Sequence, residues 1–164
     1  MAIFIIWTAL IQIIDVQAVS QNGTDIGFSA LNQQFHKLTG VHMLFYTITD
    51  WLALVPTAVC MGFALIGLVQ LIKRKSLYKV DTDILLLGVY YIIVNVFFWS
   101  FELIQINYRP IPIEGRMEAS YPSSTTLFVV SVMLPFAFQV SRRVKTSSLR
   151  YGLYGCTAVF TLFM

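Results

Sequence analysis

Residues 51–72 form an unbroken apolar run that carries no charged side chain. A helix of about 20 residues crosses the hydrocarbon core of a bilayer, so this run is long enough to span a membrane. Further apolar runs cover 84–106 and 127–140, the latter extending back to Pro122, and another begins at Ala2. Such continuous runs exclude a transmembrane barrel, whose strands alternate apolar and polar residues over about ten positions. The sequence therefore predicts helices within a membrane.

The low charge of the chain supports this fold class. Apolar residues make up 57% of the 164 residues and charged residues only 12%, whereas soluble domains carry roughly 25% charge. We expect an all-α, polytopic transmembrane helix bundle with four complete spans and a partial fifth. The complete spans begin near Ala2, Trp51, Ile84 and Pro122. The fifth covers 151–164, and its length of about 14 residues is too short for a crossing.

The chain divides by composition into three predicted segments. Residues 1–18 form a first span or a signal-like segment, although they lack the basic start of a signal peptide and have a weak cleavage site. Residues 19–50 are mixed and polar, and apolar side chains spaced three or four apart from Phe28 to Leu38 predict an amphipathic helix on the membrane surface or against other helices. Residues 51–164 form the transmembrane core.

The basic residues predict the orientation in the membrane. Most of the eleven Lys and Arg residues lie in the loops after the second and fourth spans, and such loops face the cytoplasm. The N-terminus is then cytoplasmic, and residues 19–50 and the loop after the third span face outward. These loops account for the net charge of +3, so no nucleic-acid partner is expected. The basic loop residues are Lys73, Arg74, Lys75, Lys79, Arg142, Arg143, Lys145 and Arg150.

A polar stretch from Asn107 to Thr126, NYRPIPIEGRMEASYPSSTT, separates the third and fourth spans. Proline lacks an N–H and has a fixed φ, so Pro122 is predicted to lie in the first turn of a helix rich in hydroxyls. A helix start exposes N–H groups and the positive end of the dipole, and Arg109 would add donors that match phosphate. Two interpretations are open: an anion site, or a capped helix start with an interfacial arginine nearby.

The same stretch resembles the first two signature motifs of the type 2 phosphatidic acid phosphatase and haloperoxidase superfamily. That family carries Lys, six residues and Arg-Pro, then Pro-Ser-Gly-His, then Ser-Arg, five residues, His, three residues and Asp. Arg109-Pro110 matches the end of the first motif, and Pro122-Ser123 matches the start of the second. The string ASYPSS at 119–124 resembles the bacterial membrane branch, in which Ser-Ser often stands for Ser-Gly.

The sequence also departs from the family pattern. The lysine of the first motif falls on Glu102, and the histidine of the second falls on Thr125. The third motif is absent, because Ser141-Arg142 matches its start but Ser148 stands at the histidine position. The chain is therefore expected to be a fragment truncated before the third motif; the alternative is a short protein whose last helix is a half-span.

The resemblance implies an enzyme that hydrolyses lipid or isoprenyl phosphates without a metal or other cofactor. In the family, the third-motif histidine attacks phosphorus, the second-motif histidine protonates the leaving oxygen, and the Lys, Arg and Ser-Gly groups hold the phosphoryl oxygens. Arg109 and Ser123 are carried over as phosphate-binding residues, with the N–H groups of Ser124 and Thr125 as helpers. The implied partners are membrane lipids and a phosphorylated lipid substrate or ligand.

The departures leave two functions open. Glu102 has the wrong charge to hold phosphate, so it is expected either to orient Arg109 or Arg116 through an ion pair or to be a simple carboxylate at a helix end. Thr125 can donate a hydrogen bond but does not titrate as a general acid near neutral pH. A complete chain is expected to be a phosphatase, with residues 1–164 alone inactive. The alternative is a catalytically inactive membrane protein that binds lipid phosphate or is structural.

The two histidines, His36 and His42, do not indicate a metal site. They are six positions apart, whereas a metal pair on one helix face is spaced by a single turn. We interpret them as ordinary interfacial histidines, and no metal is expected.

Overall fold

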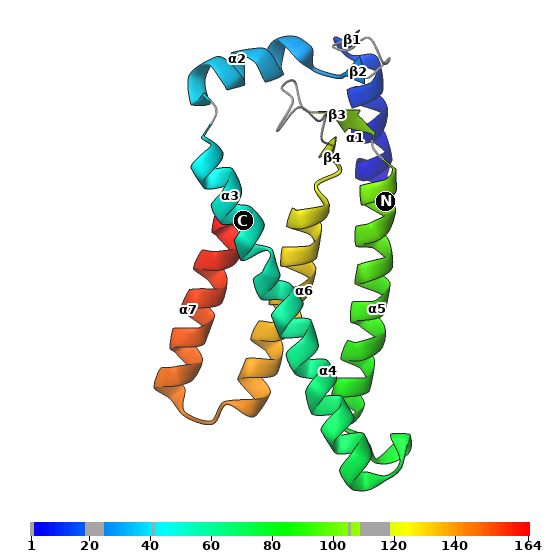
Figure 1. The fold of residues 1–164 in the computed structure, drawn as a ribbon, viewed down its shortest axis with the longest axis vertical. Helices are drawn as coiled ribbons and strands as arrows, with labels where there is room; N and C mark the ends of the chain where they lie inside the picture. Colours follow the sequence, from blue (N-terminus) through cyan, green and yellow to red (C-terminus); the bar gives the residue numbers. More distant parts are fainter. Residues whose placement is uncertain (1, 19–24, 41, 105, 109–118) are drawn as a thin grey trace. The chain divides into compact units, whose positions relative to one another are not determined.

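The computed structural model describes residues 2–18, 25–40, 42–104, 106–108 and 119–164 (Figure 1). These residues form an all-α structure with two pairs of very short strands. The chain separates into two compact units, one made of Met1–Met43 and Ser100–Ser124, the other of Leu44–Trp99 and Thr125–Met164. The predicted division of the chain at residues 18 and 50 is based on composition and stays a prediction.

Helices dominate the second unit. They are α3 (Met43–Leu52) from Leu44, α4 (Leu54–Arg74), the 3₁₀ turn η1 (Leu77–Lys79), α5 (Thr82–Leu103) up to Trp99, α6 (Ser124–Arg143) from Thr125, and α7 (Ser147–Phe163). Helix α4 ends because Lys75 adopts a left-handed conformation, with φ 51° and its N–H bonded to the carbonyl of Leu71. A residue of this conformation commonly terminates a helix and satisfies one of its last carbonyl groups.

Tyr91 of α5 lies at the centre of the packing among α4, α5 and α6. Its ring centroid is 6.4 Å from that of Phe63 in α4, and its hydroxyl donates a hydrogen bond of 3.4 Å to the carbonyl oxygen of Val132 in α6. Val132 has no exposed surface. The buried cluster consists of Leu87, Tyr91, Val94, Phe128 and Val132, with Val59, Cys60, Phe63 and Phe98 packed against it.

Among the described residues, three helices are long and apolar enough to cross a membrane. Their outer faces carry exposed apolar side chains, for example Met61, Ile92 and Leu134, which in a bilayer would contact lipid while the helix satisfies its own backbone groups. These helices agree with the predicted second, third and fourth spans. They cover Met43–Arg74, Thr82–Leu103 and Ser124–Arg143.

The predicted first span is wrong in length. Helix α1 (Ala2–Ile13) has 12 residues, which gives about 18 Å, whereas the hydrocarbon core is about 30 Å thick. Beyond the helix, Asp15 has a left-handed backbone with φ 49° and the chain enters the strand β1 (Gln17–Ala18). The four complete spans predicted from the sequence are therefore corrected to three within the described ranges.

The second span is interrupted near its start by Pro56. Helix α3 (Met43–Leu52) ends, and α4 begins at Leu54 after a turn at Ala53. Pro56 has no N–H to bond to the carbonyl of Leu52, and its ring crowds that carbonyl. The break between the two helices thus lies about one turn before this proline.

The last helix is α7, and its role as a partial fifth span stays a prediction. Helix α7 has 17 residues, which gives about 26 Å. It begins at Ser147 rather than Tyr151, because Thr146 is extended and the following residues already have helical backbone.

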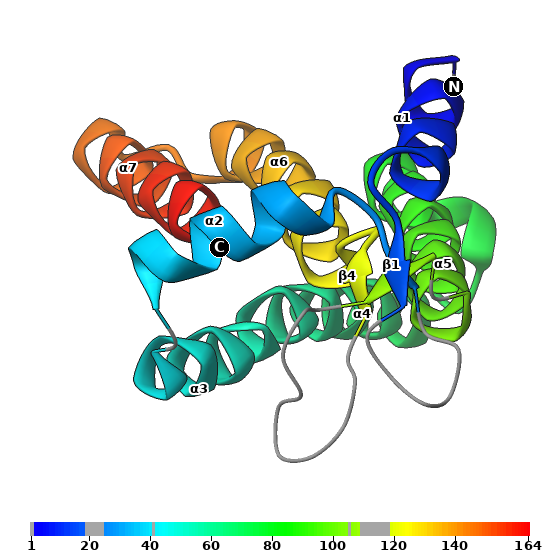
Figure 2. The same cartoon turned by 90° about the horizontal axis from the view of Figure 1, so that it is seen from above.

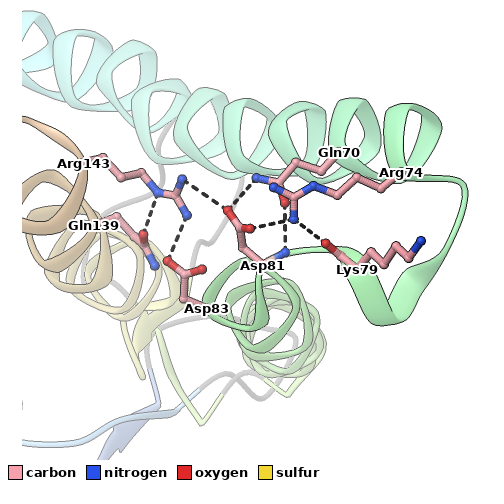
Figure 3. A network of polar contacts seen from close by, with 7 residues as sticks. All are labelled: Gln70, Arg74, Lys79, Asp81, Asp83, Gln139 and Arg143. Atoms are coloured by element: carbon pink, nitrogen blue, oxygen red, sulfur yellow. Dashed lines mark hydrogen bonds and ion pairs between the residues drawn. The ribbon is translucent and has the colours of Figure 1, made fainter.

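A polar network joins the ends of α4 and α6 to the start of α5 (Figure 3). The carboxylate of Asp81 lies 2.8 Å from the guanidinium of Arg74 and accepts a hydrogen bond of 2.8 Å from Gln70. Arg143 of α6 pairs with Asp83 at 2.9 Å. These ion pairs neutralise two of the basic residues in the predicted cytoplasmic loops. The hydrogen bonds from Arg74 and Gln70 hold the pKa of Asp81 below its ordinary value.

The first unit contains two antiparallel strand pairs, and Figure 2 labels one strand of each, β1 and β4. Strand β1 pairs with β2 (Asp25–Ile26), and Gln17 lies opposite Ile26. Strand β3 (Asn107–Tyr108) pairs with β4 (Ala119–Tyr121), and Asn107 lies opposite Tyr121. Helix α1 contacts the last turn of α5, where the ring centroids of Phe4 and Phe101 are 6.0 Å apart.

Helix α2 (Ser29–Thr39) confirms the helix predicted over this part of the chain. Asp15 binds its first turn, because its carboxylate accepts a hydrogen bond of 2.6 Å from the N–H of Ala30 and its carbonyl accepts one of 3.1 Å from the N–H of Ser29. A negative charge is favourable at a helix start. The apolar side chains of the predicted face are exposed, which leaves contact with a membrane surface as a prediction; they are Leu31, Phe35 and Leu38.

Candidate functional site

The β3–β4 pair lies beside the two segments that resemble family motifs. Tyr108, the residue directly before Arg109, lies opposite Ala119, and Asn107 lies opposite Tyr121, with a register shift between Asn107 and Tyr108. The resemblance to the first motif ends at residue 110, and the resemblance to the second begins at residue 122. The strand pair therefore holds residues 107–108 beside residues 119–121.

Helix α6 begins at Ser124, which corrects the predicted start at Pro122. Pro122 is buried and follows a cis peptide bond with Tyr121, and the exposed Ser123 lies between it and the helix. Ser123 therefore lies just before the helix, and Ser124 is its first residue. The N–H groups of Ser124 and Thr125 belong to the first turn, where a helix offers its own N–H groups no acceptor.

Ser124 contacts the residue that stands at the lysine position of the first motif. Its hydroxyl, which is buried, donates a short hydrogen bond to the carboxylate of Glu102 in the last turn of α5. The carboxylate thus lies at the start of α6, where the helix dipole favours a negative charge. This hydrogen bond is a third role for Glu102, in addition to the ion pair and the simple helix-end carboxylate expected from the sequence. Arg109 and Arg116 lie outside the described residues, so the ion pair expected with either of them stays a prediction.

The candidate site residues are thus described in part. The structure places Ser123, Ser124 and Thr125 consecutively at the start of α6, and it brings Glu102 to Ser124. The position of Arg109 as a phosphate ligand falls outside the described residues and stays a prediction.

Asn107 is the site residue that sequence reasoning missed. Its side chain is 6% exposed. Its oxygen Oδ1 accepts a hydrogen bond of 2.9 Å from the N–H of Gly27, and its nitrogen Nδ2 donates one of 3.1 Å to the hydroxyl of Ser120. A single asparagine after an apolar run is typical of any helix end at an interface, so the sequence offered no signal for this role.

An aromatic cluster borders β4 on the side of α1. The ring of Phe4 stacks on Tyr121 with centroids 5.9 Å apart and on Phe101 at 6.0 Å. The hydroxyls of Thr8 and Tyr121 are 3.2 Å apart, within hydrogen-bond distance. Helix α1 therefore supports the residue that directly precedes Pro122.

The residues described here do not form a metal centre. Groups of three or more His, Cys, Asp or Glu side chains that could hold an ion are not found among them. His36 lies in α2, and His42 directly precedes α3.

In comparisons with known proteins, no family model matches the chain, and neither a curated protein nor a solved structure is similar to it. The fold itself defines the class. It is an all-α protein in which three helices of the described chain are long and apolar enough to cross a membrane, consistent with a membrane protein.

Proposed function

We propose that this chain is part of a membrane phosphatase of the type 2 phosphatidic acid phosphatase and haloperoxidase superfamily, which acts on lipid or isoprenyl phosphates. Residues 102–125 supply the phosphate-binding side of the site. The reaction is hydrolysis of a phosphate monoester or pyrophosphate. The attacking histidine belongs to a third motif that these 164 residues do not include.

One observation carries this proposal. Eleven residues separate the two segments that resemble the first and second motifs, and β3 and β4 pair beside them. In addition, Glu102 at the lysine position touches Ser124 of the second motif. A family in which both motifs bind one phosphoryl group needs the two segments to meet in this way.

The residues at the start of α6 have the chemistry for an oxyanion. The N–H groups of Ser124 and Thr125 and the positive end of the helix dipole favour a phosphoryl oxygen. In the proposal, Ser123 and the guanidinium of Arg109 complete the set, because an arginine fork matches phosphate oxygens in two places. Donors fixed before the reaction stabilise the charge that develops during phosphoryl transfer.

The proton for the leaving oxygen must come from another source than residue 125. Threonine does not titrate near neutral pH, so Thr125 only donates a hydrogen bond. Water or another group supplies the proton in a complete chain, and the rate falls accordingly, since general acid catalysis contributes about 10²–10⁴-fold.

The contact between Glu102 and Ser124 favours a second candidate, a membrane protein that binds lipid phosphate or is structural and does not turn over. The hydroxyl of Ser124 already donates its hydrogen bond to the carboxylate of Glu102. The negative charge of this carboxylate would repel a phosphoryl group placed beside it. In this candidate the protein has the same fold and lies in the membrane, but it does not catalyse hydrolysis.

We propose further that the site faces the extracytoplasmic side of the cell membrane. Both loops rich in Lys and Arg would lie in the cytoplasm, and the start of α6 is at the opposite end of that helix from Arg142 and Arg143.

The deciding experiment uses the natural full chain, purified in detergent and mixed with phosphatidic acid in mixed micelles. Release of inorganic phosphate that orthovanadate inhibits is the expected result. Tight vanadate binding without phosphate release favours the second candidate as a phosphate binder. A chain that neither binds vanadate nor releases phosphate overturns both phosphate-based readings.

A further inference from the structure

We infer that Asn107 is a positioning residue, which fastens the segment around Gly27 to the β3–β4 pair and thereby sets the place of the phosphate-binding helix start. The inference deepens the proposed function and rests on it. It makes the N-terminal part of the chain a component of the site, although no motif residue lies there.

The first step is the burial of a polar side chain with both ends satisfied. Asn107 is 6% exposed, and its amide oxygen and nitrogen bind Gly27 and Ser120, at 2.9 Å and 3.1 Å. A carboxamide is one of the few groups that accept from a backbone N–H and donate to a hydroxyl at the same time. Buried polar groups of this kind fix one arrangement, because losing a partner leaves the other group unsatisfied.

The second step is the fit of Gly27. A Cβ atom at this position would lie 1.8 Å from the carbonyl oxygen of Ile11, so no larger residue fits without movement of the backbone. The neighbouring Ile26 is 1% exposed. The carbonyl of Gly27 accepts a hydrogen bond of 2.9 Å from the side chain of Asn32 in α2. Both backbone polar groups of Gly27 therefore have side-chain partners.

The third step connects this contact to the site. Ser120, which accepts from Asn107, donates in turn to the carbonyl oxygen of Tyr108 at 3.2 Å. Asn107 therefore links Gly27 to both strands of the pair, β3 directly and β4 through Ser120. Only Tyr121, Pro122 and Ser123 separate Ser120 from the first residue of α6, so a shift of β4 displaces Ser124 relative to Glu102.

The test measures vanadate binding to the full chain in detergent, by affinity and by stoichiometry. Asn107→Ala is expected to raise the dissociation constant by roughly tenfold, typical for loss of a buried polar contact, with the number of sites per folded molecule unchanged. A purely structural role would do the reverse, lowering the number of competent molecules and leaving their dissociation constant unchanged. In the active enzyme, a positioning role of Asn107 predicts a raised KM, whereas a purely structural role predicts a lowered kcat.

Two further variants sharpen the result. Gly27→Ala keeps the N–H that donates to Asn107 but brings a Cβ atom against the carbonyl oxygen of Ile11. It therefore displaces the same segment by another route and should also raise the dissociation constant for vanadate. Asn95→Ala is the matched control, because the hydrogen bond that the structure describes for the side chain of Asn95 runs to the carbonyl of Tyr91 in its own helix, at 2.8 Å. Its vanadate affinity should equal that of the wild type.

Failure of the inference and failure of the proposed function are distinguishable. Wild-type protein that does not bind vanadate removes the proposed function. Amide hydrogen exchange then still tests the contact, since exchange in residues 119–121 should be faster in Asn107→Ala than in the wild type. Unchanged vanadate affinity in Asn107→Ala, or unchanged exchange where vanadate does not bind, overturns the inference.

Discussion

The hydroxyl of Ser124, at the first residue of α6, donates a hydrogen bond to the carboxylate of Glu102, in the last turn of α5. The two residues are 22 positions apart, and each stands at a motif position of the proposed family. This contact places a negative side chain where the proposed function requires a phosphoryl group. Substitutions at Glu102 therefore measure the effect of this contact on ligand binding and on the stability of the fold.

Glu102→Gln should bind orthovanadate more tightly than the wild type, by about tenfold. Removing one negative charge about 4 Å from the ligand is worth about 1 kcal/mol in water and more in a less polar site. The same substitution should lower the stability of the fold by about 0.3–1 kcal/mol, because a carboxylate at a helix start is favourable. Glu102→Asp, which keeps the charge, is the control. Weaker vanadate binding in Glu102→Gln would mean that the carboxylate assists the ligand.

Arg109→Ala should weaken vanadate binding by about 1–3 kcal/mol, the usual loss for a hydrogen bond to a charged group. The prediction rests on the Arg-Pro motif. Binding is measured by titration of the full chain, with Arg150→Ala in α7 as a basic residue remote in sequence from both motifs. Equal affinities of Arg109→Ala and wild type would remove Arg109 from the site.

Residues 1–164 alone should release no phosphate from phosphatidic acid. The reason is chemical: the sequence contains no histidine after His42, so the nucleophile that the family uses is missing beside the motifs. The purified segment is incubated with phosphatidic acid in mixed micelles, and inorganic phosphate is measured. Vanadate-sensitive release by this segment would show that another nucleophile acts.

The network around Asp81 should lose its contribution to stability in acid. The pKa of this carboxyl group is lowered, first by the hydrogen bond from Arg74 and then by that from Gln70. A lowered folded-state pKa stabilises the fold fully above the ordinary aspartate pKa of about 3.9, and the contribution is lost as pH falls below it. The unfolding midpoint in detergent is compared at pH 7 and pH 3.5. Between pH 7 and pH 3.5 the unfolding midpoint should fall less in Asp81→Asn than in the wild type. In Asp50→Asn, a substitution in α3, it should fall as far as in the wild type.

Val132→Ala should destabilise the helix packing by about 1–3 kcal/mol, because the site is fully buried and the vacated volume lies between α5 and α6. In a membrane the loss is one of packing contacts more than of water exclusion. Unfolding by a denaturing detergent measures it. Val130→Ala in the same helix is the control, with a side chain that is 37% exposed, and should change stability much less. Equal losses in both variants would contradict the packing of this core.

Several features of the fold could be predicted from the sequence, because they depend on local composition. Long apolar runs form helices wherever backbone polar groups have no water to bind, and the helices Thr82–Leu103 and Ser124–Arg143 lie where these runs lie. Helix boundaries were less predictable. The first helix ends at Ile13, and α6 begins at Ser124 rather than Pro122. Turn conformations and the pairing of strands from distant parts of the chain compete with helix extension at these ends.

The sequence by itself determined the helical class, three of the predicted apolar spans and the residue types of the two segments that resemble family motifs. Only the tertiary structure decided that Glu102 meets Ser124 and that Asn107 joins Gly27 to the strand pair. The physical reason is the separation along the chain over which each interaction acts. Hydrophobicity and helix formation act over a few neighbouring residues, whereas a hydrogen bond between Gly27 and Asn107, 80 positions apart, exists only after the chain has folded.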